Sequence, residues 1–101
     1  MMRSIQATSS GELSANAQIM STGGYLHGFE LNPPVSGIAT LKLYDSNNST
    51  TAGKLLLATA TVASGMNSVY CEFPGLRTAN VGIYAVLGGT STTYSVGFSL
   101  G

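Results

Sequence analysis

Charge is the scarcest property of this chain. Only 8% of its 101 residues are charged, and four basic residues balance four acidic ones, so the net charge is zero. Soluble domains usually carry about 25% charged residues. A surface with so little charge does little to keep separate copies of a protein apart. We therefore expect a single small domain whose surface is largely covered by neighbouring subunits, rather than a free monomer.

Other scarcities exclude several classes of function. Cys71 is the only cysteine, so neither an internal disulfide nor a multi-cysteine zinc site is possible, and we interpret it as a small buried hydrophobe. The basic residues are scattered, whereas nucleic-acid binding needs clustered Lys or Arg. No apolar run approaches the roughly 18 residues of a membrane span, and no signal peptide is recognisable. We expect no nucleic-acid partner, no membrane association and synthesis in a cytoplasm.

Candidate catalytic groups are few and isolated. His27 is the only histidine, and it alternates with Tyr25 and Phe29, which predicts a satisfied histidine on an apolar face in the core or at an interface. Glu30 should then lie on the opposite face of the same strand, so the two cannot form a dyad. The acidic residues fall in four different segments: Glu12, Glu30, Asp45 and Glu72. No nucleophile elbow or P-loop is present either. We predict that the protein is not an enzyme.

Residues 45–48, Asp-Ser-Asn-Asn, carry oxygen ligands and are the best candidate for a calcium loop. They lack the glycine at the sixth position and the glutamate at the twelfth that such a loop requires. We interpret them as a polar turn that leads into a flexible loop. We expect no metal site, no cofactor and no catalytic residue.

Turn-forming residues recur about every ten positions, and the segments between them are rich in β-formers. Short strands at this regular spacing indicate an antiparallel sandwich or barrel. In the last of them Tyr94, Val96 and Phe98 share one face with Leu100, which is typical of a sheet with one buried side. The expected strands cover residues 4–8, 13–20, 25–31, 38–45, 55–62, 67–73, 80–87 and 93–100.

Three strands have apolar rows that we assign to the core: Ala39, Leu41 and Leu43; Leu56, Ala58, Ala60 and Val62; and Val81, Ile83, Ala85 and Leu87. Their opposite rows are less polar than a monomer's surface usually is, and apolar patches of this kind often mark a contact surface. The residues of this predicted interface are Ile38, Tyr44, Leu55, Leu57, Tyr84 and Val86. Two alternatives stay open: loops cover these rows, or the face assignment is reversed on one strand.

The N-terminal segment, residues 1–12, is polar and has no core signal. Such a segment often becomes ordered only when it lies across a neighbour, where it can add a strand by main-chain pairing. We predict a docking arm over residues 1–12 and a sandwich domain over residues 13–101.

Two segments resemble small structural proteins of tailed-bacteriophage virions. LKLYDSNNSTTAGKLLLATATV (residues 41–62) is similar to their strand ending in LYD, a loop and a following leucine-rich strand. FPGLRTANVGIYAVLGGTSTTYSVGF (residues 73–98) is similar to the endings of these proteins. The resemblance implies a jelly-roll-like antiparallel β-sandwich of about 7–8 short strands, located in the virion and made in the host bacterial cytoplasm.

The resemblance also implies a role. It favours a non-enzymatic capsid cement, or decoration, protein that stabilises the head by bridging capsid subunits. The partner would be the major capsid protein or another virion protein, and by analogy with the class the homo-oligomer would be a trimer. The alternative is a tail, fibre or baseplate module that binds a partner protein or a host glycan. For a glycan, the candidate cluster is Tyr44 with Asp45, Asn47 and Asn48.

Overall fold

The computed structural model describes residues 7–89 and 91–101, and within these ranges it contains eight strands and no helix. The all-β expectation is confirmed, and each expected strand overlaps an observed one. The described residues therefore include no helix that is long and apolar enough to cross a membrane. The strands are β1 (Thr8–Ser9), β2 (Ala17–Met20), β3 (Gly24–Leu31), β4 (Ile38–Tyr44), β5 (Leu56–Ala63), β6 (Val69–Ala79), β7 (Ile83–Gly88) and β8 (Tyr94–Leu100).

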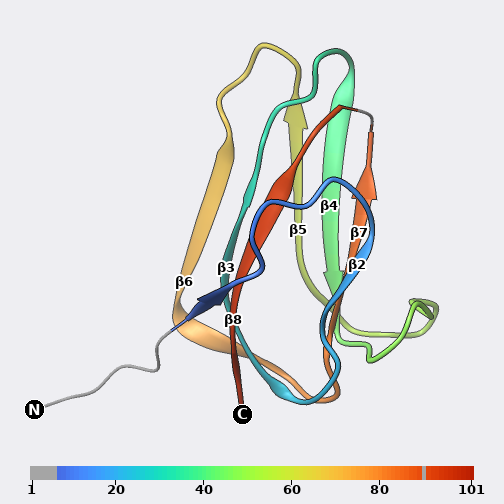
Figure 1. Ribbon diagram of the computed structural model, residues 1–101, viewed down its shortest axis with the longest axis vertical. Coiled ribbons are helices and arrows are strands. Elements are labelled where there is room, and N and C mark those ends of the chain that lie inside the picture. Colours follow the sequence, from blue (N-terminus) through green and yellow to red (C-terminus); the bar gives the residue numbers. More distant parts are fainter. Residues whose placement is uncertain (1–6, 90) are drawn as a thin grey trace, which may run out of the picture.

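The strands form two antiparallel four-stranded sheets that pack as a sandwich (Figure 1). Sheet A has the order β1-β8-β3-β6, and sheet B has the order β2-β7-β4-β5. The pairs β1–β8, β2–β7, β3–β6 and β4–β5 are nested, as if one long hairpin had been rolled up. Two further pairs, β3–β8 and β4–β7, close the roll. This strand order is that of a jelly roll.

The core lies between the two sheets, where alternate residues of each strand point inward. On β4 and β7 the expected core rows are confirmed: Ala39, Leu41, Leu43, Ile83 and Ala85 are buried. On β8, Tyr94 and Val96 are buried as expected, but Leu100 is exposed at the C-terminal end. Val81 was expected in the β7 row, but it precedes the strand and is also exposed. On β4, β7 and β8, alternation therefore assigned the strand centres correctly and failed at the ends.

Leu57 is a correction to the predicted interface. It is only 4% exposed and belongs to the core, whereas Leu56 is 42% exposed. The cause is a β-bulge: Leu43 pairs with Ala58 and Tyr44 pairs with Leu56, so Leu57 is an extra residue without a partner on β4. A bulge shifts the alternation by one residue. The face assignment is thus reversed at this end of β5, one of the two alternatives left open above.

The second half of the predicted N-terminal arm belongs to the sandwich. β1 pairs with β8, and the backbone N–H of Ser10 donates to the Val96 carbonyl at 2.8 Å. Leu13 continues the contact through a bridge to Tyr94. In Figure 1 the dark blue N-terminal strand lies beside the red C-terminal one. The docking arm therefore overlaps the fold from residue 8 onward, and its residues 1–6 lie outside the described part of the chain.

Tyr94 anchors the segment between β1 and β2 to the core. Its hydroxyl donates to the Ala15 carbonyl at 2.7 Å, and its side chain is fully buried. Burial raises the pKa of Tyr94 to about 12, and the nearby Tyr84 acts in the same direction. An unfolded tyrosine ionises near pH 10. Between these two values the unfolded state loses its proton first, so folding stability should fall as the pH rises from about 10 to about 12.

We therefore predict that Tyr94→Phe reduces this alkaline loss of stability. Near pH 7 the substitution should lower the free energy of unfolding by about 1 kcal/mol, because it leaves the Ala15 carbonyl without its hydrogen-bond donor. Urea unfolding of both proteins near pH 9 and pH 11 would measure the difference. Equal losses between the two pH values in both proteins would show that Tyr94 is not the responsible group.

Candidate functional site

Four of the predicted interface residues lie on the outer face of sheet B: Tyr44, Tyr84 and Val86 are together, and Ile38 is at the other end of β4, beyond Thr40 and Lys42. Because β4 and β7 are adjacent, Tyr44 pairs directly with Tyr84, and Lys42 pairs with Val86. The bulge on β5 brings Leu56 opposite Tyr44 on the other side. The outer rows expected on β4 and β7 thus adjoin, whereas the expected row of Leu55 and Leu57 is replaced by Leu56, which had been assigned to the core. We call it the B face, and its residues are Ile38, Lys42, Tyr44, Leu56, Tyr84 and Val86.

The B face is nearly free of charge. Lys42 is the only charged residue of β4, β5 and β7. Ile38 is 60% exposed, while Tyr44, Tyr84 and Val86 are half-buried by their neighbours on the sheet. Leu55, the remaining predicted residue, precedes β5; it is exposed, and its carbonyl accepts from the Asp45 N–H at 2.8 Å. In the described part of the chain, Leu55 thus lies next to a face that combines aromatic and aliphatic side chains with Lys42 and the threonines Thr40, Thr59 and Thr61.

A groove lies on the outer face of sheet A, and the sequence did not predict it. Leu26 of β3 pairs with Phe98, and Gly28 pairs with Gly97, so His27 is an extra residue in a bulge. The bulge shifts the alternation, and His27 and Glu30 therefore line the same groove. We had expected them on opposite faces of the strand, with His27 on the apolar one; both expectations are wrong.

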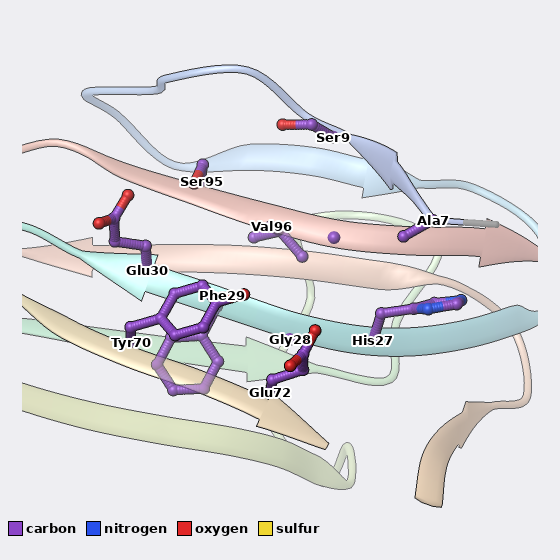
Figure 2. Close-up of a pocket in the computed structure, with 11 residues that line it drawn as sticks. Ala7, Ser9, His27, Gly28, Phe29, Glu30, Tyr70, Glu72, Ser95 and Val96 are labelled. Carbon is purple, nitrogen blue, oxygen red and sulfur yellow. The ribbon is translucent and has the colours of Figure 1, made fainter. Parts of the chain in front are cut away.

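The groove has a cavity volume of about 200 Å³. Gly28 and Gly97 leave its centre without side chains, and Glu72 lies between the His27 and Glu30 positions (Figure 2). Tyr70, which is 68% exposed, pairs directly with Glu30 and contributes an aromatic wall. No Lys or Arg is among the described residues that line it. An aromatic ring beside carboxylates suits a ligand with hydroxyl or amide donors.

His27 is satisfied within the fold, as expected. Its Nε2 is 2.8 Å from the Ser99 hydroxyl of β8, and Ser99 is buried. This contact ties the bulged residue to the next strand. It also occupies one of the two ring nitrogens, so the histidine has a structural explanation that requires no catalytic role.

In the polar turn at residues 45–48, the side chains of Asp45 and Ser46 form hydrogen bonds with backbone groups of the fold. The Asp45 carboxylate, 6% exposed, accepts from the backbone N–H groups of Asn80 and Val81, both at 2.9 Å. The fully buried Ser46 hydroxyl lies within hydrogen-bond distance of the carbonyls of Asn48 and Thr50, between which its single proton is shared. These contacts explain the polar residues without a calcium ion. In the ranges 7–89 and 91–101, no three His, Cys, Asp or Glu side chains are grouped to hold a metal.

The predicted glycan cluster does not assemble. Asp45 is nearly buried and each of its carboxylate oxygens accepts from a backbone N–H, whereas Tyr44 belongs to the B face. Asn47 and Asn48 remain exposed on the loop. The Tyr70 groove on sheet A, not this turn, is where an exposed aromatic ring and carboxylates meet.

Comparison with known proteins finds no family model, no curated protein and no solved structure that matches this chain. Conclusions about function therefore depend on the surfaces described above.

Proposed function

We propose that the protein is a non-enzymatic structural subunit of a tailed-phage virion, a capsid cement that bridges neighbouring capsid subunits through its B face. The observation that carries the proposal is that Tyr44, Tyr84, Val86 and Leu56 adjoin on one nearly uncharged face, with Ile38 farther along the same face. The low overall charge and the resemblance of residues 41–62 and 73–98 to small virion proteins support it. The partner is the major capsid protein.

The energetics of such a contact fit a cement role. Burial of about 400 Å² of apolar surface contributes roughly 10 kcal/mol at 25 cal/mol per Å², before association costs that can offset most of it. Each contact is then weak, and a shell is strengthened by the sum over many copies. A face without charge suits this arrangement, because buried unpaired charges oppose binding.

Val86→Glu tests the proposal. In the isolated protein the new carboxylate lies opposite Lys42, so the fold should tolerate it. In a buried contact it must be desolvated, and occupancy on particles should fall at least about tenfold. Thr78→Glu is the matched control, because it adds the same charge at an exposed position on sheet A. Mass spectrometry of purified particles would measure occupancy.

Cryo-electron microscopy of the same particles would locate the protein. Many copies on the icosahedral shell, with the B face against the capsid, are expected. A small number at the tail, or normal occupancy of Val86→Glu, would contradict the cement proposal.

The Tyr70 groove favours a second candidate, a tail, fibre or baseplate module that binds a partner protein or a host glycan. Its supporting observation is an exposed tyrosine that pairs with Glu30 beside an open cavity. Tyr70→Ala separates the two candidates. It should leave occupancy unchanged if the B face docks, and it should abolish attachment to host cells if the groove binds a surface glycan.

A further inference from the structure

The edges of the two sheets differ in how they are protected. An exposed edge strand has unpaired N–H and C=O groups that can pair with another chain, and proteins protect edges by short strands, charges, proline or bulges. In the described part of the chain, β1 has two residues and β2 has four, so both are short. β6 carries Glu72 and Arg77, and its pairing is interrupted around Pro74 and Gly75.

β5 is the exception. Its eight residues, LLATATVA, include no charge, no proline and no glycine, and its only irregularity is the bulge at Leu57. Threonine and valine favour strands. We propose that β5 pairs antiparallel with β5 of a second copy of this chain, which joins two B sheets into one continuous sheet. The proposal does not depend on the virion role.

The backbone groups that are free for this pairing follow from the β4–β5 register. The Ser64 N–H donates to the Gly37 carbonyl at 2.9 Å, which continues the register in which Ile38 pairs with Ala63. In an antiparallel pair, successive residues direct their N–H and C=O groups alternately toward and away from the partner strand. Residues 60 and 62 therefore pair with β4, and residues 59, 61 and 63 face the open edge.

One end of the edge is already covered. The Arg77 Nη1 of β6 donates to the Leu57 carbonyl at 3.2 Å, and its guanidinium carbon lies 4.6 Å from the centroid of the Phe73 ring. This cation–π contact holds Arg77 across the gap between the two sheets. The free stretch of the β5 edge is thus residues 59–63.

Within this stretch, residues 59–61 are self-complementary about Ala60, whereas Ala63 would face Leu57 of the second copy, whose carbonyl Arg77 occupies. A two-fold axis there places Thr59 opposite Thr61 of the second copy, and both residues have edge-facing backbone groups. Their side chains are exposed on the outer face, where cross-strand threonine pairs are favourable. The same axis brings the end at Leu56, which is exposed, toward the end at Met66 of the second copy, also exposed. Zero net charge leaves no repulsion between the copies.

The interface is small. Stable complexes bury about 800 Å² on each partner, and an edge that pairs over residues 59–61 offers less. We expect a two-fold dimer that dissociates on dilution, with a dissociation constant on the order of 100 µM. Sedimentation velocity of the purified full chain over a concentration series would detect it.

Charge complementation tests the register. Thr59→Glu/Thr61→Glu and Thr59→Lys/Thr61→Lys each place like charges opposite one another, so each variant alone should dimerise at least about tenfold more weakly. Mixing the two variants should restore a dimer, because Glu then faces Lys. Thr61→Pro is an independent variant, since it removes an N–H that β4 does not use. Circular dichroism would verify that each variant is folded.

The outcomes are distinct. A wild-type monomer at all concentrations, a trimer, or an association that the edge variants leave unchanged would each overturn the β5 pairing. Dimer loss in the single variants with recovery in the mixture would establish it. Particle occupancy of Val86→Glu is measured separately, so failure of either proposal leaves the other intact.

Discussion

Asp45→Ala should destabilise the protein by about 3 kcal/mol, because it removes two charge-assisted hydrogen bonds from a nearly buried site. Both Asp45 oxygens accept backbone N–H groups from the connection between β6 and β7, one from Asn80 and one from Val81. The carboxylate thus ties the end of β4 in sheet B to the chain leaving sheet A. A domain of this size has roughly 5–15 kcal/mol of stability in total. Urea unfolding would measure the change.

Two variants in the same loop control the measurement. Asn47→Ala changes a neighbouring exposed side chain and should stay within about 0.5 kcal/mol of the wild type. Asp45→Asn keeps one acceptor oxygen but turns a donor toward the other N–H, so it should be nearly as damaging as Asp45→Ala. If Asp45→Ala matched Asn47→Ala, the two backbone donors would be satisfied by water, and Asp45 would not hold the connection.

The sequence predicted the number and the approximate place of the strands because turn residues mark most of the connections. It also predicted which side of β4 and β7 is buried, since alternation alone decides this where a strand is regular. Residues 74 and 75 show the limit of turn chemistry. The strand expected over residues 67–73 ends before Pro74 and Gly75, but β6 continues through these two residues to Ala79, with its pairing to β3 interrupted between Glu72 and Arg77.

The candidate sites were less predictable, and bulges are the main reason. A bulge inserts one residue and reverses the alternation on one side of it, yet it depends on pairing with a distant strand and has no local sequence signal. The bulge at Leu57 exchanged Leu56 and Leu57 between surface and core. The bulge at His27 placed His27 and Glu30 along one groove.

Strand order was the other feature that the sequence could not predict. Alternation gave outer apolar rows on β4 and β7, but only the order β7-β4-β5 shows that these rows touch each other and Leu56. The same order leaves β5 at a sheet edge, where the absence of charged residues leaves its backbone open to pairing with another strand. The segment LLATATVA alone does not show that it lies at an edge. Local pattern thus predicts faces, and long-range pairing decides which faces become a surface.

Gly28→Ala should be strongly destabilising, whereas Gly97→Ala, its direct partner on β8, should be nearly neutral. A Cβ on Gly28 would collide with the Cys71 carbonyl oxygen and lie 3.1 Å from the Glu72 Cα. These are backbone atoms of β6, so the collision can be removed only if the two paired strands β3 and β6 move apart. Overpacking of this kind costs about 3 kcal/mol, toward the upper end of the usual range.

At Gly97 the nearest atom to a new Cβ is the His27 Cβ at 3.7 Å, an ordinary contact. The alanine there also restricts the unfolded chain, so Gly97→Ala should be neutral or stabilising by up to about 1 kcal/mol. Urea unfolding of the two variants would compare them. Equal effects at both positions would mean that β6 moves freely past the bulge. A large difference would show that close packing of β6 against Gly28 holds the bulge, and with it the position of His27 beside Ser99.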